Sequence, residues 1–176
     1  MLICVQYALA QIETITADNA RLVSNLHANL GGLYRMNGHP DLAREHMEKS
    51  ISLLDQFNLL HINDSIPQIA NYAMFLTEQQ EPERGISELQ KLSGIIKEYH
   101  SDDCLDYAKV QETLGTIYLM TANLPQAKTH FKRAFKIYEK IWADEPEMIE
   151  AKYQEIQELY PQIGFCIGKT LSGLLT

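Results

Sequence analysis

The sequence predicts an all-α protein in which antiparallel helix pairs stack into an α-solenoid. The main observation is a motif that returns every 42 residues, as Asn29-Leu30-Gly31-x-x-Tyr34, Asn71-Tyr72-Ala73-x-x-Leu76 and Thr113-Leu114-Gly115-x-x-Tyr118. Twelve positions after the Gly or Ala of each copy stands a second small residue, namely Ala43, Gly85 and Ala127. In every copy, a break that contains Pro lies between the motif and this second small residue. A fixed period of this length is typical of stacked copies of one supersecondary unit.

The first element is predicted from the phase of the repeat. Subtracting one period from apolar positions of the 40–58 segment gives Val5, Leu9, Ile12 and Ile15. Residues 1–17 should therefore form the second helix of an incomplete repeat, and its apolar side chains would lack their usual partner helix. We expect either that the chain is a fragment of a longer protein or that another subunit or the C-terminal segment covers this face.

Residues 20–58 form the first complete repeat. The pattern breaks at 37–40, where Gly38 can take a left-handed cap and Pro40 suits the first turn of a new helix. Apolar residues recur at helical spacing on both sides of this break, so each helix turns one stripe toward a core. The stripes are Leu22, Leu26, Leu30, Leu33 and Tyr34 in the first helix, and Leu42, Ala43, Met47, Ile51, Leu54 and Phe57 in the second.

The breaks return with Pro82 and Pro125, which predicts further repeats at 62–100 and 104–142. Residues 146–176 are predicted to be a degenerate capping helix followed by an apolar C-terminal segment. We expect residues 163–175 to pack against the open end of the solenoid or against another chain.

These residues resemble the tetratricopeptide repeat (TPR), whose signature is Leu-Gly-x-x-Tyr in the first helix and a small residue, an aromatic and Ala in the second. The middle copy is weaker, with Ala73, Leu76 and Gly85. The 42-residue form is similar to the repeats of kinesin light chains and of bacterial peptide-sensing and regulatory proteins. The resemblance implies a right-handed superhelix whose concave groove, lined by first helices, holds a peptide. The matching residues are Leu30, Gly31, Tyr34, Ala43, Leu114, Gly115, Tyr118, Ala127, Phe131 and Ala134.

The resemblance also implies which residues face this groove. An Asn amide both donates and accepts, so it can pair with a peptide backbone whatever the peptide's side chains. Arg35 and Lys109 would meet an acidic side chain or carboxylate. The alternative is that the asparagines are polar residues on a solvated face or cap neighbouring helices, and Thr113 interrupts the Asn ladder. The candidate binding residues are Asn25, Asn29, Arg35, Asn71, Met74, Lys109, Thr113 and Thr116.

The composition excludes several classes of function. The chain has 15 Lys and Arg against 23 Asp and Glu, a net charge of −8, which argues against nucleic acid and anionic membranes as partners. No apolar run approaches the ~20 residues of a membrane span, and the N-terminus lacks the features of a signal peptide. We expect a soluble, cytoplasmic protein in which Cys4, Cys104 and Cys166 are reduced core thiols.

Other motifs receive plainer interpretations. Residues 164–170 resemble a phosphate-binding loop, but three residues separate the glycines where the motif needs four. The six histidines lack ligand spacing, and no nucleophile and base stand together, so we predict no metal, no cofactor and no catalysis. One basic stripe is interpreted as a solvated convex face, partly neutralised by the acidic helix after it, with docking of an acidic partner as the alternative. The stripe is Lys128, Lys132, Lys136 and Lys140.

The sequence therefore favours a non-enzymatic scaffold that binds a protein or peptide in a concave groove. The alternative is the sensor or oligomerisation portion of a larger regulator, such as a transcription regulator or a signalling NTPase. A third hypothesis is a homodimer formed through the unpaired end helices.

Overall fold

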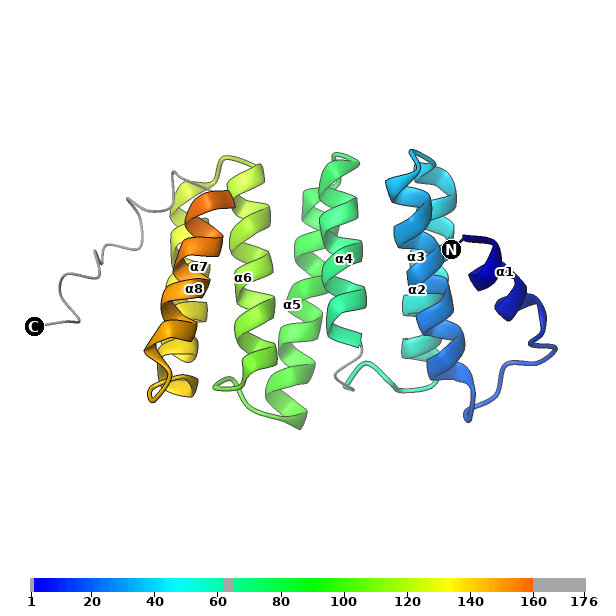
Figure 1. Cartoon of the computed structure of the whole chain (residues 1–176), viewed down its shortest axis with the longest axis horizontal. Coiled ribbons are helices and arrows are strands. Elements are labelled where there is room, and N and C mark those ends of the chain that lie inside the picture. The colour runs from blue at the N-terminus through cyan, green and yellow to red at the C-terminus, as the bar shows by residue number, and fades with distance from the viewer. Residues whose placement is uncertain (1, 62–64, 160–176) are drawn as a thin grey trace, which may run out of the picture. The chain divides into compact units, whose positions relative to one another are not determined.

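The computed structural model describes residues 2–61 and 65–159, and within these ranges the chain forms eight α-helices and no strand (Figure 1). The chain divides into two compact units, Met1–Tyr99 and His100–Thr176. The helices are α1 (Leu2–Ala10), α2 (Ala20–Met36), α3 (Pro40–Gln56), α4 (Ser65–Glu78), α5 (Pro82–Tyr99), α6 (Leu105–Met120), α7 (Leu124–Ile141) and α8 (Pro146–Leu159).

The helices pair as the repeat predicts. The pair α2 and α3 lies within 20–58, α4 and α5 within 62–100, and α6 and α7 within 104–142, and the two members of each pair pack against each other. The all-α prediction is therefore confirmed. The phosphate-loop-like motif, Cys166 and the apolar segment 163–175 lie outside the described residues.

A turn of one geometry joins the two helices of every pair. In each turn, the amide N–H after the left-handed residue donates to the carbonyl oxygen five positions back, at 2.9, 2.8 and 2.7 Å in chain order. This is the hydrogen bond of a Schellman cap, which satisfies a carbonyl at the helix end. The left-handed residues stand one period apart and are Gly38 (φ 74°), Gln80 (φ 66°) and Ala122 (φ 58°).

The small residues of the motif let paired helices approach closely. A Cβ added to Gly85 would lie 2.6 Å from the backbone oxygen of Ala73. A Cβ added to Gly31 would lie 2.5 Å from Cγ of Met47. Both distances are far inside van der Waals contact, so packing requires glycine at these positions.

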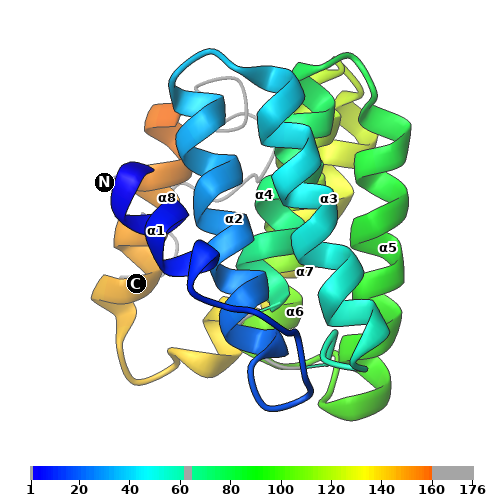
Figure 2. The ribbon, with the colours of Figure 1, turned by 90° about the vertical axis from the view of Figure 1, so that its right-hand side faces the viewer.

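Helix α1 packs on the core of the first unit, beside α2 (Figure 2). Its Leu2, Val5 and Leu9 are partly buried against that core, and the Gln6 amide donates to the hydroxyl of Tyr34 at 2.8 Å. The apolar face that we expected another subunit or the C-terminal segment to cover is thus partly covered by the first unit itself. The buried residues of this cluster are Leu30, Tyr34, Ala43, Met47, Tyr72, Phe75 and Leu76.

Helix α1 is shorter than the predicted 1–17, because it ends at Ala10. The residues that follow are rich in β-branched side chains, which favour helices less than straight chains do. The Asn19 side chain also holds this stretch in a turn. It accepts from the Thr16 amide at 2.8 Å and donates to the Thr14 carbonyl at 2.9 Å.

Three side chains expected in the core are exposed. Leu22 and Leu42 retain 56% and 40% of their accessible surface, since each lies at the edge of its helix stripe rather than at its centre. Cys4 lies on the outward face of α1, so it is not a core thiol, while Cys104 is half-buried, and both thiols are free.

Aromatic side chains build the core of the second unit. Phe131, Phe135 and Tyr138 of α7 are almost fully buried. Helix α8 docks on them, because the Tyr153 ring stacks on Phe135 with centroids 4.0 Å apart and Ile156 is 3% exposed.

Candidate functional site

A hollow of about 480 Å³ lies in the first unit between the first helices α2 and α4. Two of the candidate binding residues predicted from the sequence, Arg35 and Asn71, line it. Its lining residues are Ala28, Gly32, Arg35, Met36, Met47, Ser50, Gln68, Asn71 and Glu78.

Two of the α2 residues that line this hollow are small. Ala28 and Gly32 stand four positions apart, so they share one helix face. A Cβ added to Gly32 would meet nothing within 4 Å. Unlike Gly31, this glycine is not required by packing, and its absent side chain leaves open space in the hollow.

An ion pair between α2 and α4 forms part of the lining of the hollow. The Arg35 guanidinium donates to both carboxylate oxygens of Glu78, with Nε to Oε2 at 2.8 Å. The side chains are 34% and 36% exposed, so solvent reaches this pair. Arg35, expected to meet a ligand carboxylate, is thus already paired with a carboxylate of the chain itself.

Gln68 organises a polar cluster beside the hollow. Its Oε1 accepts from the hydroxyls of Ser24 and Ser50, at 2.8 and 2.6 Å. Its Nε2 donates to Oδ1 of Asn25. Both serines are buried, so Gln68 supplies partners that buried hydroxyls need. Asn25, predicted to hold a ligand, is therefore engaged in joining α2 to α4.

The remaining candidates of the first unit are accessible. Asn71 lines the hollow and Asn29 is exposed on α2. Within the described residues, neither amide makes a hydrogen bond to the chain. Met74 is half-buried on α4 and is not part of the lining. Asn71 is thus the candidate that combines a free amide with a place in the hollow.

The candidates of the third repeat lie on α6, in the second unit. The hydroxyls of Thr113 and Thr116 donate to carbonyls of their own helix, at 3.0 and 3.1 Å. Lys109 pairs with Asp106 at 3.8 Å and lines a smaller hollow of about 290 Å³ against α8, together with Trp142 and Met148.

Sequence reasoning missed Gln68 and Glu78 as members of the site. Gln68 stands three residues before Asn71, on the same helix face, and this spacing could have pointed to it. Glu78 lies one period and one residue after Arg35, and a carboxylate at that place could have indicated the ion pair.

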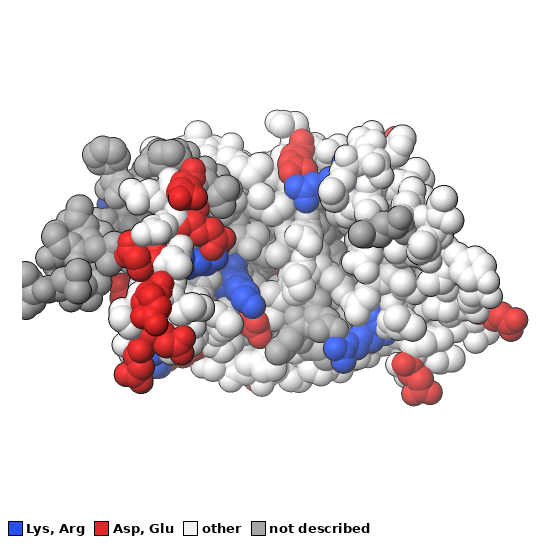
Figure 3. Space-filling model, viewed as in Figure 1, with Lys and Arg blue, Asp and Glu red and all other residues white. Residues whose placement is uncertain are grey.

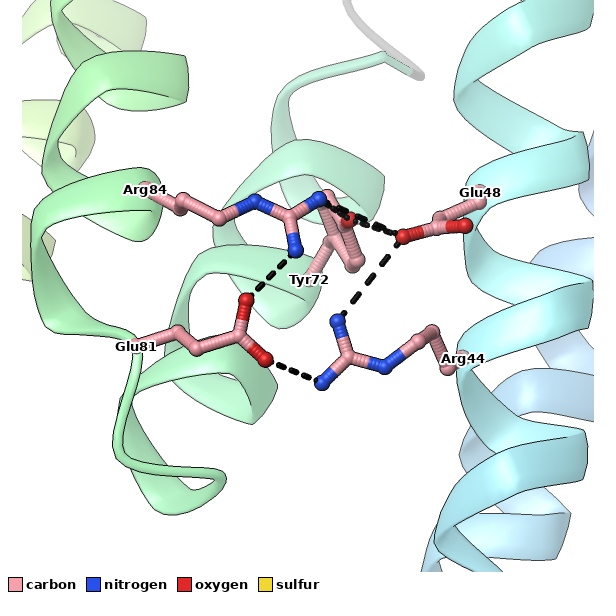
Figure 4. A network of polar contacts seen from close by, with 5 residues as sticks. All are labelled: Arg44, Glu48, Tyr72, Glu81 and Arg84. Atoms are coloured by element: carbon pink, nitrogen blue, oxygen red, sulfur yellow. Dashed lines mark hydrogen bonds and ion pairs between the residues drawn. The ribbon is translucent and has the colours of Figure 1, made fainter.

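A network of charges joins the first repeat to the second on the other side of α4 (Figure 4). Arg44 of α3 donates to Glu81 at 2.5 Å, and Arg84 donates to the other oxygen of Glu81 at 2.5 Å. Tyr72 of α4 donates to Glu48 at 2.8 Å. Both arginines hold the pKa of Glu81 below its ordinary value. All four charges are mutually paired, so the network serves the packing of α3, α4 and α5.

No residue set in the described ranges suits a metal. They contain no group of three or more His, Cys, Asp and Glu side chains that could hold an ion. Nor does any helix described by the structure have the length and apolar character needed to cross a membrane.

Residues 65–140 match the family model described as tetratricopeptide repeat. This stretch, from α4 to α7, carries tetratricopeptide repeats. The solved structure of BtubC (BKLC) from P. vanneervenii is similar to this chain, with a TM-score of 0.66 and 19% sequence identity. The match covers 77% of this chain and 54% of that chain, so this chain spans about half of the length of BtubC. No curated protein matches the sequence.

The predicted resemblance to tetratricopeptide repeats is therefore confirmed, and with it the α-solenoid class. Tetratricopeptide repeats generally mediate protein–protein interactions and typically serve as non-catalytic scaffolds.

Proposed function

We propose that this chain is a non-enzymatic, cytoplasmic scaffold that binds an extended peptide segment of a partner protein in the hollow between α2 and α4. The observation that carries the proposal is that the hollow combines open space above Gly32 with the accessible side-chain amide of Asn71. Gly32 leaves space for a backbone to approach, and Asn71 can donate to and accept from that backbone. Ala28, one helical turn before Gly32 on the same face of α2, also has a small side chain that leaves the hollow open.

The other candidates take different roles in this proposal. The Arg35–Glu78 pair forms part of the lining that the peptide would contact. Asn25 and Gln68 hold α2 and α4 at the separation that the peptide needs. Asn29 adds a second amide on the exposed face of α2. Because the polar lining residues other than the ion pair are neutral, recognition rests on the backbone and on apolar contacts with Met36 and Met47.

The test is a selection from a peptide-display library, followed by affinity measurement of the enriched peptides against two matched variants. Gly32→Leu fills the hollow. Gly94→Leu adds the same side chain to α5, at a glycine that also has open space around it. We expect Gly32→Leu to weaken binding at least about tenfold and Gly94→Leu to leave it unchanged. If the peptides bound Gly32→Leu and Gly94→Leu with equal affinity, the hollow between α2 and α4 would not be their binding site.

A second candidate function is self-association through α1, favoured by an exposed apolar pair. Ile3 and Tyr7 stand four positions apart on this helix and retain 79% and 67% of their accessible surface. Neighbouring exposed apolar side chains of this kind are typical of interaction surfaces. Light scattering over a range of concentrations tests this, since Ile3→Glu/Tyr7→Glu should abolish any increase in mass that the native chain shows. A monomeric native chain would exclude it.

A further inference from the structure

Helix α7 of the second unit carries a basic face that packing within the fold does not explain. The exposed surface of this helix contains five cations and no exposed carboxylate, because its single acid, Glu139, is half-buried and accepts from the Tyr153 hydroxyl at 3.5 Å. One third of the chain's 15 Lys and Arg thus stand on one helix of a chain with a net charge of −8. The five are Lys128, Lys132, Arg133, Lys136 and Lys140.

The corresponding helices of the other repeats do not share this property. On α3 the exposed face mixes signs, with Glu45 beside Lys49. On α5, Glu83 and Arg84 stand together and Lys91 pairs with Asp55 of α3 at 3.4 Å. A uniformly basic face is therefore a feature of α7 and not of second helices in general.

The expectation that the acidic helix after the stripe neutralises it is wrong. Within the described residues, Lys128 and Lys132 form no ion pair and no hydrogen bond. Lys140 pairs with Asp103, which precedes α6, and not with α8. The reason is that α8 docks through Tyr153 on the buried side of α7, so its carboxylates lie away from the stripe.

Lys140, and Lys136 more weakly, interact with Asp103, which leaves Lys128 and Lys132 without a carboxylate in the described part of the chain, and this is unfavourable for the helix. Lys128, Lys132, Lys136 and Lys140 form three successive i, i+4 pairs, and like charges at this spacing destabilise a helix. From this arrangement we propose that the basic face of α7 docks an acidic segment of a partner protein, which supplies the missing carboxylates.

The distribution of acidic residues favours a short protein segment over a nucleic acid or a membrane. The stripe is a single row, and its twelve-residue span on α7 corresponds to ~18 Å of helix. Helix α8 packs against α7 in the same unit and is covered by carboxylates (Figure 3). A nucleic acid or an anionic membrane would extend beyond the stripe, where a chain of net charge −8 would repel it. A segment no longer than the stripe contacts α7 alone.

The test uses fluorescence anisotropy of a labelled Ala/Glu peptide with Glu at i, i+4 spacing and roughly the length of the stripe, ~18 Å as a helix. The competitors are a single-stranded oligonucleotide and phosphatidylserine vesicles. The test variant replaces Lys128, Lys132 and Lys136 with Gln. The matched control replaces the exposed Lys49, Lys91 and Lys97 with Gln, so the net charge changes equally. Circular dichroism checks that both variants retain the native helix content.

We expect the stripe variant to bind the acidic peptide about tenfold more weakly than the native chain, because three exposed pairs of modest strength are lost. The control should bind as the native chain does, and added salt should abolish the difference. Three results would overturn the proposal: no binding of the peptide by the native chain, equal loss in both variants, or tighter binding of the oligonucleotide or vesicles than of the peptide. Each is independent of the groove between α2 and α4.

Discussion

The Nδ1 atoms of His27 and His46 lie 2.9 Å apart and share one hydrogen bond across the α2–α3 pair. One ring donates and the other accepts, which requires that at least the acceptor is neutral. Burial lowers the pKa of His27 to about 4, helped by the neighbouring His46 and Lys49. Burial also lowers the pKa of His46, opposed by Glu45. The folded chain therefore keeps this pair uncharged at neutral pH.

This pair predicts that stability falls on acidification. Below the ordinary His pKa of about 6.5, the unfolded chain takes up protons at both rings, while folded His27 stays neutral until the pH nears 4. The free energy of unfolding contributed by the pair is thus present at neutral pH and is lost as the pH falls from about 6.5 toward 4. His27→Gln removes one of the two groups and leaves an amide for His46, as Gln111 serves His130 at 2.9 Å.

The measurement is the thermal midpoint by circular dichroism across that pH window. We expect a smaller drop in His27→Gln than in the native chain. His39→Gln, at an exposed position before α3, is the control and should drop as far as the native chain. The same drop in all three proteins would show that the pair does not carry the effect.

The two kinds of helical glycine predict opposite effects of alanine. Gly85→Ala should destabilise, because its Cβ would lie 2.6 Å from the Ala73 carbonyl oxygen, and backbone yields less than a side chain. Overpacking of this kind typically costs about 1–3 kcal/mol. Gly94→Ala should stabilise by about 1 kcal/mol, since its Cβ meets nothing and Ala is the better helix former. Urea unfolding compares them, and a loss of stability in Gly94→Ala would contradict the packing argument.

The close-packed glycines belong to the part of the fold that the sequence predicts well. The period places Gly85 and the left-handed turns at Gly38, Gln80 and Ala122. Two of these turn residues are not glycine, so their conformation follows from repeat phase rather than from residue type. Turn conformations and close helix contacts that recur with the motif can therefore be predicted from a single sequence.

The polar contacts of the site could not be predicted in the same way. Two of these contacts link the first repeat to the second: Arg35 pairs with Glu78, and Asn25 accepts from Gln68. These pairs depend on how long side chains meet across two helices, and a periodic apolar pattern does not encode that. The motif therefore placed both asparagines on first helices but could not separate Asn25, which pairs with Gln68, from Asn71, which lines the hollow.

The charge network between the first two repeats predicts a measurable coupling. Arg44 and Glu81 meet at 2.5 Å with side chains 28% and 32% exposed. A double-mutant cycle with Arg44→Met and Glu81→Gln should give a coupling free energy of about 0.5–1 kcal/mol that decreases with salt. Lys91 and Asp55 also join α5 to α3, at 3.4 Å, but are more exposed. A cycle on that pair should give a value near zero, and equal couplings would contradict a special role for the network.

The two asparagines predict different consequences of losing an amide. Asn25→Ala removes the acceptor of Gln68 Nε2, which binds α2 to α4. This should cost about 1 kcal/mol, the typical loss for one hydrogen bond. Asn71→Ala removes an exposed amide that makes no hydrogen bond within the described part of the chain, so its effect on stability should stay within about 0.5 kcal/mol. For peptides selected on the native chain, the order reverses, because Asn71 faces the groove. Urea unfolding and peptide affinity measured on both variants separate the two roles. If Asn71→Ala lost stability and kept its affinity, this residue would be a structural one and the groove would need another polar contact.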